Sequence, residues 1–137
     1  MMSLYETDAF ASLPETYSSL GQVNLRVEEE HTLSVTLRIK VLQSTCVTEL
    51  KALVKQCLSK PNLKHVLLNL SQVTHMDSFG LASVLGLYKE LRESGGHFIL
   101  VNPNSNLLQL IEITRLNHVL PIVDTVPQAL ELIRTNP

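Results

Sequence analysis

The middle of the chain joins two apolar runs by a helical pattern, and this arrangement restricts the fold more than any other feature. Residues 64–70 are typical of a strand, and the unbroken Val66-Leu67-Leu68 predicts burial on both of its faces. Apolar residues then recur at helical spacing over 81–91, Gly95-Gly96 ends this helix, and 98–101 form the next strand. Because the links are short, the unit predicts two parallel strands joined by a crossover helix.

The flanking segments continue the alternation of strands and helices. Alternating apolar residues predict strands at 23–27 and 33–39, joined near Glu29-Glu30-His31. A helix follows these strands; Ser44 or Thr45 can cap it, and Pro61-Asn62 ends it. After residue 101 the pattern predicts a helix around 107–111 and then an edge strand over 119–123, which contains Pro121. A last helix is predicted over 126–133, with Asp124 or Thr125 near its cap.

The pattern as a whole predicts a single α/β domain. The chain has 137 residues, which is enough for one buried core, and no linker divides it. We expect a domain over 21–137, with a small mixed sheet of about four to five strands and four helices packed around it. Residues 1–20 show no clear period and contain Pro14, so we expect an extended or disordered N-terminal arm.

Composition and charge exclude several functional classes. The net charge is -2, aromatic residues make up 4%, and no Lys/Arg run is present, so nucleic acid is not an expected partner. No apolar run reaches the roughly 18 residues of a membrane span, so direct membrane insertion is not expected. Residues 1–15 lack the basic and apolar regions of a secretory signal, which predicts a cytoplasmic location.

Cysteine and histidine spacing indicates neither a disulfide nor a metal site. Cys46 and Cys57 fall in one expected helix, about 16 Å apart, which is beyond the reach of a disulfide bond. There is no CxxC motif, and the histidines do not have the spacing of metal ligands. We therefore expect no metal and no cofactor.

Ser78 occupies the most informative position, the turn between a strand and a helix in Met76-Asp77-Ser78-Phe79-Gly80-Leu81. A serine there can be a helix cap, a nucleophile or a phosphorylation switch. A nucleophile elbow needs Gly-x-Ser-x-Gly, and Met76 fills the first glycine position. His75 and Asp77 lie two residues apart in a loop, a spacing that is common by chance. The sequence therefore does not favour an enzyme.

From about Val66 to Ile133 the sequence resembles the STAS domain family of bacterial anti-sigma factor antagonists. The resemblance rests on 68–73, 76–81, 95–102, 113–116, 119–124 and 129–130, and its order of elements extends back to residue 20. It implies a STAS-like fold, a small mixed sheet with helices around it, in agreement with the pattern. The chain departs from the family at three places. Asn69 stands where aspartate is usual, the first strand-to-helix turn has Lys40 and Gln43 where a glycine and an aspartate are usual, and Arg115 stands where glycine is usual.

The resemblance implies that Ser78 is phosphorylated by a partner that is both an anti-sigma factor and a serine kinase, and that a phosphatase resets the switch. Residues around Ser78 would then contact the partner: Thr74, Met76, Asp77, Phe79 and Gly80. The alternative implied by the family is a STAS module that does not switch and serves as an accessory subunit of a transporter or as a signalling scaffold.

Three side-chain placements follow from these expectations. Phe79 is either an exposed anchor for the partner or a core residue at the start of the helix. Gly80 is expected to give a partner close access to the backbone of the first turn. The buried stripe of the helix is expected to contain Leu81, Val84, Leu85, Tyr88 and Leu91, with Ser83 and Lys89 off that stripe.

Overall fold

The computed structural model describes residues 22–59 and 62–136, without the side chains of Gln22, Ser44, Thr45 and Cys57. The main sheet has the order β1-β2-β4-β6-β7. Its strands are β1 (Gln22–Glu28), β2 (Thr32–Arg38), β4 (His65–Asn69), β6 (Phe98–Val101) and β7 (Ile122–Val123). β1 pairs antiparallel with β2, and all other neighbours are parallel, so the predicted mixed sheet is confirmed.

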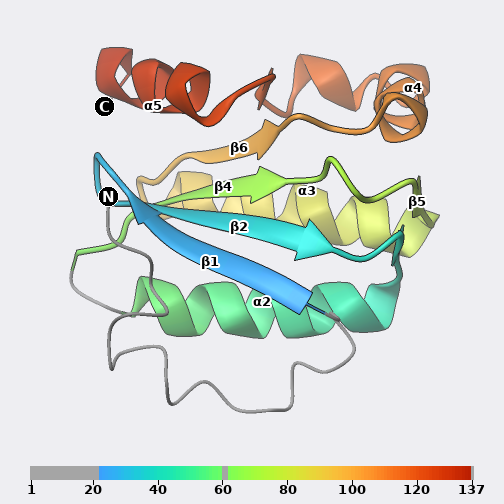
Figure 1. Ribbon diagram of the computed structural model, residues 1–137, viewed down its shortest axis with the longest axis horizontal. Coiled ribbons are helices and arrows are strands. Elements are labelled where there is room, and N and C mark those ends of the chain that lie inside the picture. The colour runs from blue at the N-terminus through green and yellow to red at the C-terminus, as the bar shows by residue number, and fades with distance from the viewer. Residues whose placement is uncertain (1–21, 60–61, 137) are drawn as a thin grey trace.

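Within residues 22–59 and 62–136, four α-helices pack around this sheet, as predicted. They are α2 (Ser44–Leu58), α3 (Ser78–Glu93), α4 (Ser105–Ile113) and α5 (Val126–Thr135), and a short 3-10 helix, η3 (Leu116–His118), follows α4. Figure 1 shows α2 and α5 on opposite sides of the strands. α2 and α3 contact each other and cover one face, whereas α5 covers part of the other face.

Strand β4 is buried on both faces because it lies in the middle of the sheet. Val66 and Leu68 belong to the larger core, which β1, β2, α2, α3 and α4 complete. Leu67 points into a smaller core formed with Ile99 of β6 and the apolar side of α5. The unbroken apolar run of this strand therefore indicated its position correctly.

Helix α3 ends as the glycine pair predicted, but its buried face differs from the prediction. Gly95 has a φ of 86°, and the N–H groups of Gly95 and Gly96 donate to the carbonyls of Arg92 and Leu91, which closes the helix end. Leu87 is buried and is 1% exposed, whereas Leu85 and Tyr88 are only half-buried. The sequence Val84-Leu85-Gly86-Leu87 fits either stripe, and the packing against the sheet selects Leu87.

Two other expectations need correction or fall outside the described residues. The strand expected over 119–123 is limited to β7, because η3 and Pro121 precede it. β7 is nonetheless the predicted edge strand. The predicted N-terminal arm, the cap by Ser44 or Thr45 and the break at Pro61 lie outside the residues or side chains described. In the described part of the chain, no helix combines the length and apolar character needed to cross a membrane.

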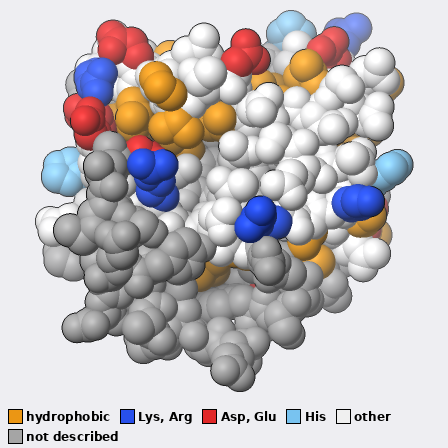
Figure 2. Space-filling view, in the orientation of Figure 1, with side chains coloured by type: hydrophobic (Ala, Val, Ile, Leu, Met, Phe, Trp, Pro, Cys, Tyr) orange, Lys and Arg blue, Asp and Glu red, His pale blue; other side chains and the backbone are white. Residues whose placement is uncertain are grey.

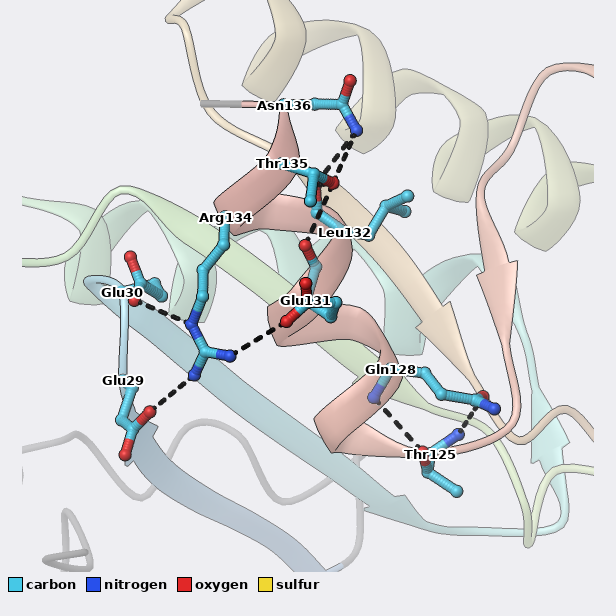
Figure 3. Close-up of polar contacts among 9 residues, drawn as sticks. All are labelled: Glu29, Glu30, Thr125, Gln128, Glu131, Leu132, Arg134, Thr135 and Asn136. Atoms are coloured by element: carbon cyan, nitrogen blue, oxygen red, sulfur yellow. Dashed lines mark hydrogen bonds and ion pairs between the residues drawn. The ribbon is translucent and has the colours of Figure 1, made fainter.

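The carboxyl-terminal helix is fixed at both of its ends by polar contacts (Figure 3). At its start, Thr125 and Gln128 form a capping box, which confirms Thr125 as the cap. Near its end, the Arg134 guanidinium contacts carboxylates of Glu29 and Glu30 at the β1–β2 turn, at 2.8 and 3.1 Å, and Glu131 at 3.2 Å. The glutamates of the β1–β2 turn therefore hold α5 against the hairpin.

A shallow hollow separates α5 from β1 on the face drawn in Figure 2, where apolar side chains gather among acidic and basic ones. It is lined by Arg26, Glu28, Glu29, Val126, Pro127, Leu130 and Arg134. Burial raises the pKa of Glu28, whose carboxylate forms an ion pair with Arg26 at 3.5 Å. The hollow thus belongs to the contact between the helix and the sheet.

Candidate functional site

Ser78 lies at the edge of the sheet where the parallel strands end, and it is the first residue of α3. The polypeptide leaves β4 and forms the two-residue strand β5 (His75–Met76), after which α3 begins. Ser78 is exposed, and among the described residues its hydroxyl has no hydrogen-bond partner. This position leaves the hydroxyl open to chemical modification.

Asp77, and not Ser78, caps helix α3. Asp77 has extended backbone angles, and its Oδ1 accepts a hydrogen bond of 2.6 Å from the Gly80 N–H. Its carbonyl accepts from the Leu81 N–H. The interpretation of Ser78 as an N-cap is therefore wrong, because the preceding carboxylate already satisfies the first turn.

A small second sheet supports this turn and was missed by the sequence analysis. Strand β3 (Val41–Leu42) pairs parallel with β5, with Val41 opposite His75 and Leu42 opposite Met76. The Lys40 carbonyl also accepts the N–H groups of Thr74 and His75 and the Thr74 hydroxyl, at 2.8, 3.1 and 3.1 Å. These backbone bonds fix the loop before Ser78 without using a charged side chain.

Gly80 is buried and lets the first turn of α3 lie directly on β3. A Cβ at this position would be 2.7 Å from the Leu42 carbonyl oxygen and 2.8 Å from Met76 Cγ, closer than such atoms approach. Met76 itself is only 8% exposed. Gly80 thus serves internal packing, contrary to the expectation that its backbone is open to a partner. Met76 is likewise buried and packs against the inner side of the turn.

Two large apolar side chains are exposed around this turn: Phe79 directly follows Ser78 in the chain, and Val41 lies on β3 opposite His75. The exposed fractions are 70% for Phe79 and 44% for Val41. Of the two placements considered for Phe79, the structure therefore shows the exposed one. The adjacent Thr74 is half-buried, and its hydroxyl lies 2.9 Å from His75 Nδ1. His75 and Asp77 thus make separate contacts and do not form an acid–base pair.

The positions where the sequence departs from the family pattern can be followed in the structure. The Asn69 side-chain oxygen accepts from the Ser71 N–H at 3.0 Å, a turn that aspartate also forms, so only the charge is absent. Gln43 is exposed at the start of α2, where its carbonyl accepts from the Val47 N–H. Arg115 has a φ of 61°, a left-handed conformation that glycine adopts most easily.

No group of three or more His, Cys, Asp or Glu side chains is arranged to hold a metal ion within residues 22–59 and 62–136. Cys46 is buried. The site therefore consists of an exposed serine, a capping carboxylate and two exposed apolar side chains, held by backbone hydrogen bonds between β3 and the loop before α3.

Comparison with known proteins shows the family of the chain. The family model of the STAS domain matches residues 25–129. A candidate anti-sigma factor antagonist of Thermotoga maritima is 36% identical over 69 residues, which are 50% of this chain and 61% of the relative, so the matched stretch spans about three fifths of that protein. The anti-sigma F factor antagonist of Paenibacillus polymyxa is 27% identical over 111 residues, covering 79% of this chain and 94% of the relative.

Solved structures of anti-sigma factor antagonists have the same fold as this chain. The crystal structure of a candidate anti-sigma factor antagonist from Thermotoga maritima superposes with a TM-score of 0.68 at 28% identity, covering 82% of this chain and 94% of the other. The phosphorylated form of SpoIIAA from Bacillus superposes with a TM-score of 0.61, covering 82% of this chain and 99% of the other, and its 21% identity supports the fold alone. The chain belongs to the STAS domain family.

Proposed function

We propose that this protein is an anti-sigma factor antagonist of the partner-switching type, acting in the cytoplasm. In the unmodified state it binds an anti-sigma factor that is also a serine kinase, and phosphorylation of Ser78 by this partner ends the complex. A serine phosphatase restores the unmodified form. The observation that carries the proposal is the exposed Ser78 hydroxyl, left without a hydrogen-bond partner among the described residues and positioned by the Asp77 cap at the start of α3.

The geometry suits a switch that acts across an interface. A phosphoryl group adds about -1.5 to -2 charges, and the amino end of a helix tolerates negative charge. Asp77 caps the helix with its own carboxylate, so the helix does not depend on the Ser78 hydroxyl. Phosphorylation would therefore change the surface presented to the partner without unfolding the domain.

The proposed contact surface consists of Thr74, Asp77, Ser78 and Phe79. Met76 and Gly80 contribute indirectly, because both are buried and hold this turn against β3. The protein would act as a binding module and not as an enzyme, since the site brings together no nucleophile, base and acid.

The test begins with purification of partners from the source cell on the full-length protein, followed by their identification. The recovered kinase is then incubated with the protein and ATP, and the intact mass is measured. We expect an addition of about 80 Da, the mass of one phosphoryl group, located at Ser78 by peptide mapping. The matched control is Ser78→Ala, which should bind the partner and remain unmodified.

Two outcomes would contradict the proposal. One is modification at Ser71, Thr74 or Ser83 with Ser78 untouched. The other is recovery of a membrane transporter without any kinase, which would favour the role of an accessory subunit.

A further inference from the structure

Four large apolar side chains are exposed among the described residues, and two of them belong to the elements that meet at the Ser78 turn, α3 and β3. Val41, Phe79, Ile113 and Val119 are 44%, 70%, 80% and 45% exposed, respectively. Phe79 belongs to the first turn of α3 and Val41 to β3. This turn rests on β3, because a Cβ on Gly80 would touch the Leu42 carbonyl. Val41 and Phe79 thus border one surface.

The frame beneath Phe79 keeps its ring in solvent. Gly80 and Leu81 turn inward and are buried, so the preceding two residues of the same turn face outward. Asp77 holds the turn in place through its bond to the Gly80 N–H. Because hydrogen bonds already hold the backbone of this turn, only the side chain has to be ordered on binding, and exposed aromatic side chains are frequent binding hot spots.

The proximity of Phe79 to Ser78 identifies the occupant of this surface. Phe79 directly follows Ser78, with Cα atoms about 3.8 Å apart, so its exposed ring lies within reach of a kinase that takes up the Ser78 hydroxyl. On the basis of the proposed function, we infer that Phe79, bordered by Val41, is the apolar anchor that enters a nonpolar pocket of the anti-sigma factor kinase beside its phosphoryl-transfer centre.

This anchor gives a physical reason for release after phosphorylation. A pocket that receives an aromatic ring excludes water, and a phosphate group on the neighbouring serine would lose hydration there. Desolvation of this kind is not screened by salt, unlike repulsion between exposed charges. The affinity of the phosphorylated protein should therefore remain low even in about 1 M salt, where the screening length is about 3 Å.

The experiment compares Phe79→Ala, Phe79→Leu and the control Ile113→Ala in the full-length protein, with the purified kinase identified by the wild-type protein as the probe. Calorimetry should show affinity reduced at least about tenfold for Phe79→Ala, less for Phe79→Leu, and unchanged for Ile113→Ala. Thermal melts of all three should match the wild type, since both side chains are exposed.

The outcomes separate this inference from the proposed function. If Phe79→Ala binds the kinase as tightly as the wild type while Ser78 is still phosphorylated, the anchor is wrong and the proposed function stands. If Ser78 is never phosphorylated, the proposed function fails first. Sedimentation velocity supplies the third outcome: a wild-type dimer that Phe79→Ala dissociates would mean that a second copy of the chain covers this surface, which would overturn the inference.

Discussion

The two edges of the parallel strands are held together by different kinds of interaction. The carboxyl edge, defined by residues 39–43 and 70–80, relies on backbone hydrogen bonds, the Asp77 cap and the close fit of Gly80. The amino edge, defined by residues 28–32, 64–65, 96–97 and 134–136, relies on the Arg134 ion pairs and on histidines. Figure 1 shows these edges on the right and on the left of the sheet, respectively.

Hydrogen bonds between histidines and backbone groups link neighbouring segments along the amino edge. The His31 carbonyl accepts the N–H groups of Lys64 and His65, and His65 Nδ1 accepts the His97 N–H at 2.8 Å. The His97 ring lies 5.1 Å from the His65 ring and contacts the Asn136 carbonyl. Burial, with smaller contributions from His97 and Lys64, lowers the pKa of His65 to about 4.

This difference suggests a division of tasks. The carboxyl edge is held mainly by backbone hydrogen bonds, close packing and one helix cap, so the candidate site keeps its shape without ion pairs. The amino edge depends on solvent-exposed ion pairs of Arg134 and on the buried His65 ring. The following predictions test this contrast, from the largest expected effect to the smallest.

The largest loss of stability is expected when a side chain is truncated in the core that lies between the two edges. Leu87→Ala should lower the free energy of unfolding by about 2–5 kcal/mol, because it leaves a cavity beneath the sheet. Leu85→Ala is the matched control on the same helix and should cost clearly less, since its side chain is only half-buried. Urea denaturation measures both, and a larger loss for Leu85→Ala would restore the stripe first predicted from the sequence.

The second effect is acid sensitivity of the amino edge. The pKa of His65 is below its unfolded value of about 6.5, so protonation favours unfolding, and the stability present above pH 6.5 is lost as the pH falls toward 4. The loss should be on the order of 2–3 kcal/mol. The raised pKa of Glu28 has the opposite effect, because it makes the folded state more stable as the pH falls. The contribution of His65 is therefore obtained by comparing the pH dependence of the unfolding free energy between the wild type and a His65 variant.

His65→Asn provides this comparison, because its side-chain oxygen can accept the His97 N–H while having no proton to gain. Its unfolding free energy should fall less than that of the wild type between about pH 7 and pH 4. Hydrogen exchange at the lower pH should first expose the amides of the amino edge in the wild type. Equal acid sensitivity of the two proteins would show that His65 does not set the pH response.

The sequence predicted the parts of the fold whose pattern repeats over several residues. The β1–β2 hairpin, β4 and α3 were identified because burial on one or both faces leaves a regular apolar period. The β3–β5 pair was missed, since strands of two residues have no period. The contacts of Arg134 with Glu29 and Glu30 span more than 100 positions, and no local pattern indicates them.

In the candidate site, too, some features could be predicted from the sequence and others could not. Asp77 and Ser78 are adjacent and both are common capping residues, so the sequence could not determine which one caps. The exposure of Phe79 and the burial of Gly80 depend on β3, which the pattern did not contain. The location of the serine at the start of the helix, in contrast, was correctly predicted from the change of period between residues 70 and 81.

The third prediction concerns the cap. Asp77→Ala should lower the free energy of unfolding by about 0.5–2 kcal/mol, because the Gly80 N–H loses its acceptor. Ser78→Ala should leave it nearly unchanged, since the hydroxyl makes no hydrogen bond among the described residues. Thermal melts at two pH values above 6.5 measure the stability of both variants. A loss of stability in Ser78→Ala but not in Asp77→Ala would show that the serine caps the helix.

The smallest effect is expected for Arg134 at the amino edge. Its ion pairs with Glu29 and Glu30 are exposed to solvent, so Arg134→Gln should lower the melting temperature less than Asp77→Ala does. Salt near 1 M should remove most of this difference, because screening acts on exposed charges, whereas the effect of Asp77→Ala should persist. The double variant with Glu29→Gln should lose less than the sum of the two single changes, since both remove the same contact. If salt instead erased the Asp77→Ala effect and left that of Arg134→Gln intact, the contrast between a charge-dependent amino edge and a carboxyl edge built on backbone bonds would have to be reversed.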